Sequence, residues 1–421
     1  MRRRHFAAFA PHCPRCAGDA ARHVLELAHV GAERDGDILA GILLCPNPAC
    51  RHEYPIIDGI PIIVPDLAHL LSERGIELLL RENLDPALES ILGDAIGPGS
   101  WFDVLRQTVS TYAWDGWADL DPAETATGPR PGAARRCLTK LLELAGEGAA
   151  ATRILDLGCG AGRTSFDLAA RHPEALVLGV DIGLALLRLA HGAAAGRLSY
   201  ARRRIGLVYD RRDFAVAPAG AERVDFWACD ALALPFAGGV ADLVVALNLL
   251  DCVASPQRLL AGMADLLRPS GRLLLATPYD WAAHATPPAA WIGGHSQRAP
   301  DGGAAEPFLR TLLTEGAHAQ SVAGLRLLGE ETDFPWQTRL HDRSLVQYAS
   351  HLLAVARQGE ARRPSTPAAR PTTPPLVAYG RSEIFMPSSW LPSVSVVSSM
   401  SVVRDATCAT CASCSPSRLL S

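Results

Sequence analysis

The chain has 421 residues, of which 48% are apolar, and a formal net charge of −4 at pH 7. This length predicts one large globular domain and a smaller one, and the charge gives no reason to expect nucleic acid or an anionic membrane as a partner. No apolar run approaches the roughly 20 residues of a membrane span, so we expect a cytoplasmic protein with reduced cysteines and no membrane partner.

Two cysteine pairs mark residues 11–66 as a small first domain. Cys13 and Cys16 are separated by two residues, and Cys45 and Cys50 by four. Four thiolates in two pairs suit a tetrahedral Zn²⁺ ion, and a site closed by four protein ligands is structural rather than catalytic. A metal makes physical sense here because so small a unit cannot build a sufficient core alone.

A hairpin is predicted after the second cysteine pair, because Asp58-Gly59 separates two runs rich in isoleucine. The cysteine pairs and this hairpin together resemble the small zinc-ribbon proteins that partner and activate RNA and protein methyltransferases. The resemblance implies a β domain that covers an apolar edge of a methyltransferase, here on the same chain. The second cysteine pair is wider than usual, which leaves His12 or His52 open as a substitute ligand.

Residues 67–132 are predicted to form a helical linker or lid. Apolar residues recur with the helical period over 67–81 and 86–92. An aromatic cluster occupies 101–120 and permits two interpretations. It either packs between the two domains or forms a lid whose Tyr112 or Trp114 closes over a ligand.

The central element of the chain is a glycine-rich turn that joins a strand to a helix. Residues 153–157 have the apolar run of a buried parallel strand, and the helix is predicted over 163–171. Gly158, Gly160 and Gly162 let the backbone turn sharply and approach a ligand, at which the helix N terminus points its N–H groups. Such a turn alone is compatible with any nucleotide cofactor.

Polar residues follow the next strands of an alternating strand–helix pattern, predicted at 177–181, 224–228, 242–247 and 272–276. Asp181 ends the second strand, where a carboxylate accepts hydrogen bonds from a ribose diol. Asp230 follows the third strand, where it can accept from an adenine amino group, and Asn248 follows the fourth. Because parallel strands carry ligands at their carboxyl ends, these side chains are expected at one site.

The order of these motifs resembles the class I S-adenosylmethionine-dependent methyltransferases. The likeness rests on Asp-x-Gly-x-Gly-x-Gly, the acid after strand two, Asp230-Ala231, and Arg-Pro-x-Gly at 268–271. A nicotinamide dehydrogenase is the competing interpretation, but its turn has the spacing G-x-G-x-x-G. The resemblance implies an α/β fold in residues 133–357, with a seven-stranded Rossmann-like sheet that ends in an antiparallel pair at 325–330 and 345–354. The S-adenosylmethionine contacts that it implies are Asp156, Gly158, Cys159, Gly160, Gly162, Asp181, Ile182, Asp230, Ala231 and Asn248.

The predicted substrate side follows the fifth strand, where aromatic residues and prolines make a rigid wall for a small planar molecule. These segments resemble the methyltransferase module at the C-terminus of ovothiol synthases, which methylates an imidazole nitrogen of a thiolated histidine. The resemblance spans about 153–357 and implies N-methylation of a small imidazole- or thiol-bearing molecule. The expected substrate contacts are Tyr112, Tyr279, Trp281 and Trp291, and the residues expected to orient the acceptor are Asn248, Asp251 and Tyr279.

Two other functions stay open. Residues 197–212 carry six arginines, which either hold an anionic substrate or RNA or form a solvated face beside acidic neighbours. If the arginines hold RNA or an anionic substrate, they favour, together with the zinc ribbon, an RNA or protein substrate for the methyltransferase. The other hypothesis is a non-catalytic activator protein of the same fold. Residues 358–421 are rich in Pro, Ser and Val, and we expect a disordered tail in which Cys408, Cys411 and Cys414 bind no cluster.

Overall fold

The computed structural model describes residues 1–18, 22–70, 93–124, 129–146, 150–314 and 316–358. The helices predicted within 71–92, the linker at 125–128 and the tail from 359 lie outside the described residues. The helices are α1 (Arg3–Phe9), α4 (Trp101–Trp117), α5 (Ala133–Ala145), α6 (Arg163–Arg171), α7 (Leu184–Ala194), α8 (Pro256–Leu266) and α9 (Ala305–Leu312). The strands are β1 (Glu26–Arg34), β2 (Asp37–Leu44), β3 (Glu53–Ile57), β4 (Ile60–Ile63), β5 (Arg153–Leu157), β6 (Leu176–Asp181), β7 (Arg197–Ile205), β8 (Val208–Ala215), β9 (Val224–Cys229), β10 (Ala241–Leu247), β11 (Leu267–Thr277), β12 (Leu325–His341) and β13 (Ser344–Arg357).

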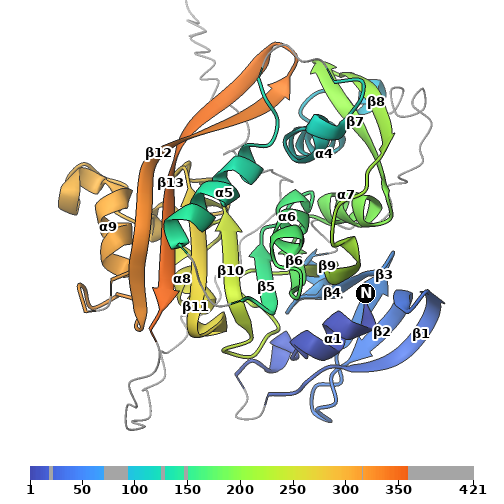
Figure 1. The fold of residues 1–421 in the computed structure, drawn as a ribbon, viewed down its shortest axis with the longest axis horizontal. Helices are drawn as coiled ribbons and strands as arrows, with labels where there is room; N and C mark the ends of the chain where they lie inside the picture. The colour runs from blue at the N-terminus through green and yellow to red at the C-terminus, as the bar shows by residue number, and fades with distance from the viewer. Residues whose placement is uncertain (19–21, 71–92, 125–128, 147–149, 315, 359–421) are drawn as a thin grey trace, which may run out of the picture.

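Within the described residues, the main sheet has eleven strands in the order β1-β2-β3-β4-β9-β6-β5-β10-β11-β13-β12 (Figure 1). Strands β9, β6, β5, β10 and β11 are parallel, and β13 runs antiparallel between β11 and β12. The chain leaves β5 toward β6 on one side and returns to β10 on the other, so β5 and β10 flank the topological switch point. Ligands of open α/β sheets bind outside the carboxyl ends of the strands at this point.

Four N-terminal strands extend the sheet beyond the seven strands predicted for residues 133–357. Strand β4 lies parallel to β9, with Ile62 opposite Ala228 and Ile63 opposite Cys229. The predicted hairpin joins β3 to β4, and Asp58 and Gly59 both have positive φ, at 53° and 82°. Without β4, strand β9 would expose a row of unpaired backbone groups at the sheet edge. The expected edge cover is therefore continuous with the Rossmann-like strands.

Helices cover both faces of the sheet. One buried cluster joins residues of α4, α5, α6 and α7 to one face, and another joins α1, α8 and α9 to the opposite face. On the first face, the Phe166 ring lies 5.6 Å from that of Trp117 and 5.5 Å from that of Phe226. These large buried rings fix α4 and α6 against the strands that carry the predicted site.

Strand β11 begins earlier than predicted, at Leu267 rather than Arg272. The segment expected to be a turn before the strand pairs in part with β10, with Ala241 opposite Leu267. Ser270 has a φ of 66°, and the register shifts beside it. The residues predicted to form a turn thus form an irregularity within a strand. The turn propensity of these residues does not distinguish the two structures.

The arginine-rich insertion forms an antiparallel hairpin of β7 and β8. Its tip lies beside the long β12–β13 hairpin, which reaches past the main sheet (Figure 1). Arg202 is buried and pairs with Glu124 and Asp342, both at 2.9 Å. Arg197 forms an ion pair with Asp213 on the neighbouring strand. The interpretation that places these arginines beside acidic neighbours is therefore confirmed for these two side chains.

Candidate functional site

The glycine turn lies between β5 and α6, as predicted. Gly158, Gly160 and Gly162 have φ values of 69°, 52° and 80°, a region that favours glycine. The backbone N–H groups of Gly158 and Cys159 donate to the Val180 oxygen at 2.8 and 3.1 Å, which ties the turn to β6. The turn is therefore held in one conformation by its neighbouring strand.

We expect Gly162→Ala to destabilise the fold strongly. A Cβ at this position would lie 2.7 Å from both Ala190 Cβ and Phe226 Cζ. Overpacking costs about 1–3 kcal/mol, and the left-handed backbone costs about 1–2 kcal/mol more. Gly36→Ala is the matched control, since its φ is 82° but nothing lies within 4 Å. Urea denaturation should show a clearly larger loss for Gly162→Ala, and equal losses would contradict the packing argument.

Asp156 lies beneath the turn and braces the start of α6. It is 1% exposed, and its Oδ2 accepts hydrogen bonds from Thr164 Oγ1 at 2.7 Å and Ser165 Oγ at 2.6 Å. Burial raises the pKa of this carboxyl to about 6, against the opposing effect of the two hydroxyl donors. The side chain that begins the predicted motif is thus engaged with the helix that follows it.

Two further predicted acids lie at the same edge of the sheet. Asp181 accepts from the Gly160 N–H at 2.9 Å and from the Gly183 N–H at 2.8 Å, so the end of β6 is pinned to the glycine turn. Asp230 follows the neighbouring strand β9, and its Oδ1 accepts from the Leu232 N–H at 2.8 Å. Each acid fixes the loop at the end of its strand. Ile182 and Ala231, the neighbours predicted with them, are partly buried.

Asn248 ends β10 on the other side of the switch point. Its φ is 53°, it is 9% exposed, and neither amide atom has a hydrogen-bond partner among the described residues. The next residue, Leu249, lies beside the turn, with its Cδ1 3.1 Å from the position of a Cβ on Gly158. A buried amide without partners is costly and is rare unless a ligand or water satisfies it.

Helix α4 packs directly on the turn. The Tyr112 ring contacts Gly160, where a Cβ would lie 3.0 Å from Tyr112 Cδ1. Trp117 donates from Nε1 to the Ala161 oxygen at 3.0 Å. Trp114 and Trp117 are almost fully buried, which favours packing over a lid for these two rings, while the Tyr112 ring lies against the glycine turn.

Arg163 was missed by sequence reasoning. Its guanidinium carbon lies 4.8 Å from the centre of the Trp117 ring, and its nitrogens donate to Asp119 at 3.0–3.1 Å. These contacts join the first residue of α6 to the end of α4. No local signal reveals them, because the partners are more than 40 residues apart in sequence.

Asp251 is the most unusual group on the predicted acceptor side. It is 1% exposed, and neither carboxylate oxygen has a partner among the described residues. Burial raises its pKa to about 7 and the negative charge of Asp280 adds to the shift, while the nearby backbone N–H groups of Asp251 and Asp280 oppose it. Its main-chain oxygen accepts from Ala282 N at 3.2 Å and Thr286 Oγ1 at 3.1 Å, which fixes the position of the residue.

The predicted aromatic wall is brought together beside Asp251. The Trp281 and Trp291 rings stack with centroids 6.1 Å apart and planes 12° apart, and the Tyr279 ring lies 6.2 Å from Trp281. Tyr279 has a φ of 57°, and its hydroxyl lies 2.6 Å from His351 Nδ1. Backbone strain of this kind is often found at functional sites. His351 was missed because β13 reaches the site only through the sheet.

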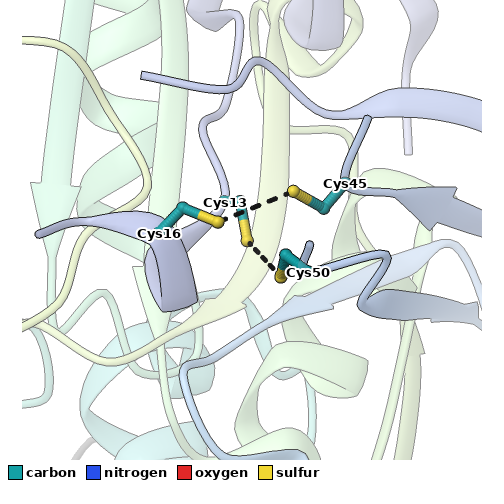
Figure 2. A group of neighbouring side chains, drawn as sticks. All are labelled: Cys13, Cys16, Cys45 and Cys50. Carbon is teal, nitrogen blue, oxygen red and sulfur yellow. Dashed lines mark hydrogen bonds between the residues drawn. The ribbon is translucent and has the colours of Figure 1, made fainter. Parts of the chain in front are cut away.

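The four predicted cysteines form one cluster in the segments that precede β1 and join β2 to β3 (Figure 2). Their Sγ atoms all lie within 4.8 Å of one another, and the Cys13–Cys50 and Cys16–Cys45 distances are both 3.8 Å. A tetrahedron with metal–sulfur bonds of about 2.3 Å has edges of about 3.8 Å, so the donor set fits zinc. The wider second pair reaches the cluster, and neither His12 nor His52 belongs to it.

The comparisons with known proteins agree with this architecture. Residues 155–275 match the family model described as a methyltransferase domain. The match is to a methyltransferase domain and covers less than a third of the chain. The domain contains the glycine turn, both strand-end acids and Asn248, whereas the zinc cluster and α4 lie outside the match.

Two curated relatives are methyltransferases by name. The chain is 29% identical over 124 residues to ubiquinone biosynthesis O-methyltransferase of Coxiella burnetii, covering 30% of this chain and 42% of the relative. It is 30% identical over 175 residues to O-methyltransferase cnsE of Penicillium expansum, covering 41% of this chain and 54% of the relative. The chain thus spans about half the length of these relatives.

A solved S-adenosylmethionine-dependent methyltransferase from Methanosarcina mazei is also similar, with 23% identity and a TM-score of 0.31. The match covers 49% of this chain and 93% of that one. No helix among the described residues is both long and apolar enough to cross a membrane.

Proposed function

We propose that this protein binds S-adenosylmethionine and transfers its methyl group to a nitrogen atom of a small molecule. The observation that carries the proposal is the pair of buried, unpaired polar side chains, Asn248 and Asp251, beside the glycine turn of a methyltransferase domain. An unpaired buried amide and carboxylate are what a site needs when its ligands complete the hydrogen bonds. The relatives' names support the reaction class.

The residues around the turn fit the donor. When bound, S-adenosylmethionine supplies a methyl group on an already activated sulfonium. The glycines allow close backbone approach, Asp181 has the strand-end position that accepts from ribose hydroxyls, and Asp230 lies where an adenine would be recognised. Asn248 would complete its amide hydrogen bonds against the backbone-like part of the donor.

The acceptor side favours a protonatable nitrogen over an anion. Its carboxylates are Asp251 and Asp280, and Asp280 accepts from Tyr348 at 3.2 Å. In the described part of the chain, no arginine or lysine is among the groups that shift the pKa of either acid. An acceptor carboxylate or phosphate would be repelled here, whereas a planar nitrogen heterocycle can donate to Asp251 and stack on Trp281. This agrees with the likeness to the module that methylates imidazole nitrogen.

Two alternatives are distinguished by specific observations. The names of the relatives favour a hydroxyl oxygen as acceptor, and an oxygen-linked methyl in the product would select that alternative. An RNA substrate has less support, because Arg202 and Arg197 are paired with acids of this chain. We keep the zinc cluster as a structural site, since four protein ligands leave no coordination position open for chemistry.

The chain's contribution to the transfer is alignment. An in-line displacement requires the nitrogen, the methyl carbon and the sulfur to be collinear, and holding reactants in this geometry can supply about 7–11 kcal/mol of the barrier. Asp251 and the Trp281–Trp291 wall would fix the acceptor, with Tyr279 beside its exchangeable proton. Tyr112 would close the site from α4.

We expect S-adenosylmethionine to bind, and Asp181→Asn to weaken its binding at least about tenfold, because a charged hydrogen bond is worth about 1.5–3 kcal/mol. Isothermal titration calorimetry measures the affinity. Asp213→Asn is the control, since Asp213 lies on β8 and pairs with Arg197 at the surface. No binding by the parent protein would defeat the proposed function.

The acceptor class is tested with labelled donor and mass detection, comparing a metabolite extract with RNA. Label in small molecules, lost in Asn248→Ala and reduced in Tyr279→Phe, is the expected result. Label found only in RNA would favour the alternative, and unchanged turnover in both variants would remove the assigned roles.

A further inference from the structure

A chain of polar groups connects Tyr279 to the molecular surface. The Tyr279 hydroxyl lies 2.6 Å from His351 Nδ1, and His351 Nε2 lies 3.3 Å from Glu330 Oε2. Arg310 Nε donates to the same carboxylate at 2.7 Å. His351 is 1% exposed, whereas the side chains of Glu330 and Arg310 are 30% and 35% exposed. The chain therefore begins at the acceptor site and ends at solvent.

The partners of His351 decide where its proton lies. An ionised carboxylate accepts hydrogen bonds only, so a neutral His351 that faces Glu330 carries its proton on Nε2. Its Nδ1 is then an acceptor, and the Tyr279 hydroxyl must donate to it. The oxygen of Tyr279 keeps its lone pairs for a second donor, and the Tyr279 ring lies 6.2 Å from that of Trp281.

The charges around His351 support this neutral form. Burial lowers the pKa of His351 below its usual 6.5, while Glu330 and more weakly Glu306 oppose the shift. Arg310 holds the pKa of Glu330 below its ordinary value, although burial acts the other way. Burial raises the pKa of Tyr279, and Glu306 adds to that shift, so the tyrosine enters the reaction protonated.

We infer that His351 and Glu330 are positioning residues that make Tyr279 the exit for the proton released by the methyl acceptor. The inference rests on the proposed function and adds the fate of the proton. Asp251 accepts from the same N–H but is less suited to carry its proton away, because its carboxylate is buried and has no hydrogen-bonded route to solvent among the described residues.

The step balances in atoms and electrons. The acceptor nitrogen's lone pair forms the new N–CH₃ bond, and the electron pair of the broken S–CH₃ bond returns to sulfur. The methylated nitrogen heterocycle then carries a positive charge and an N–H. That proton passes to the Tyr279 oxygen as the tyrosine proton moves to His351 Nδ1. The imidazolium is stabilised by Glu330 and loses its Nε2 proton to water through that partly exposed carboxylate.

The first test needs no acceptor. Nitrogen-15 NMR of the full-length protein, assigned with His351→Gln, reports which ring nitrogen carries the proton at pH 7.5. We expect the Nε2–H form, and we expect Glu330→Gln to shift the His351 titration to lower pH. A proton on Nδ1, or a titration unmoved by Glu330→Gln, would overturn the inference whatever the protein binds.

The second test measures the pH profile of methyl transfer with imidazole as the acceptor and S-adenosylmethionine as the donor. His351→Gln can still accept from Tyr279 but cannot take its proton. We expect kcat to fall about 100-fold, with unchanged affinity for the donor and loss of the acidic component below pH 6.5, while the rise that Asp251 contributes near pH 7 remains. His29→Gln, an exposed histidine on β1, is the matched control and should change nothing.

The outcomes separate the inference from the function it rests on. If His351→Gln keeps the parent kcat and pH profile while both proteins bind the donor, the proton exit is wrong and the methyltransferase proposal stands. If the parent protein fails to bind the donor, the proposed function fails, and the NMR result still decides the direction of the Tyr279 hydrogen bond.

Discussion

Asp251→Asn is expected to lower kcat/KM for methyl transfer by about 10–100-fold, because a hydrogen bond to a charged group contributes about 1.5–3 kcal/mol. The asparagine keeps the shape of the side chain but cannot accept from the substrate nitrogen at two charged oxygens. Initial rates with imidazole as the acceptor, measured from pH 5 to 9, check the effect. Activity of the parent should rise as Asp251 ionises near its pKa of about 7.

The same substitution has an opposite effect on stability. The pKa of Asp251 is about 7 in the folded protein, against an ordinary value of 3.8. Because the pKa is raised in the folded protein, the contribution of Asp251 to folding stability is full below about pH 3.8 and is lost as the pH rises through about 7. A difference of about three units between the folded and unfolded pKa corresponds to about 4 kcal/mol. The parent should therefore lose about this much more stability than Asp251→Asn between pH 4 and pH 8.

Urea denaturation of both proteins at the two pH values measures the difference directly. Acids that do not interact with Asp251 titrate equally in both proteins, so their contributions cancel, and Asp280 is the exception. Asp213→Asn serves again as a control, because Asp213 is exposed. Burial therefore disfavours the ionised form of Asp251 but not that of Asp213. A difference below about 1 kcal/mol would contradict the buried, unpaired state of the carboxylate.

Removal of the metal is expected to unfold the N-terminal strands and to weaken donor binding at least about tenfold. Structural Zn²⁺ sites in small domains contribute about 10–16 kcal/mol, so the strands around the cysteines are not expected to persist without it. The cysteine segment also contacts the chain that follows β9, because His12 N donates to the Pro235 oxygen at 2.6 Å. In addition, β4 pairs with β9 just before Asp230.

The measurement combines metal analysis, calorimetry and hydrogen exchange on the parent and Cys16→Ser. We expect one zinc per parent chain, and in the variant lost protection in β4 and β9 together with weaker binding. Cys137→Ala removes a buried thiol from α5 and should keep both metal and affinity. Retained exchange protection of β4 after complete metal loss would show that hydrogen bonding to β9 suffices to hold the strand.

Local sequence determined the elements closest to the proposed donor site. The helix at 163–171 has the predicted bounds, because three glycines and a short apolar run leave few alternatives for a strand–turn–helix unit. Asp181 and Asp230 were located for the same reason, since each follows a buried strand of recognisable pattern. The hairpin at Asp58-Gly59 and the cysteine cluster were likewise accessible, because both depend on residue type and short spacing.

The tertiary structure alone decided what those elements contact. The pairing of β4 with β9 turned a predicted separate ribbon into part of one sheet, because strand order depends on backbone partners far apart in sequence. The long β12 and β13 bring Glu330 and His351 to Tyr279, and His351 lies 72 residues from Tyr279 in sequence. The spacing of residues in the sequence determines which side chains follow a strand. Burial and contacts between residues far apart in sequence determine whether those side chains are protonated, as for Asp251 and His351.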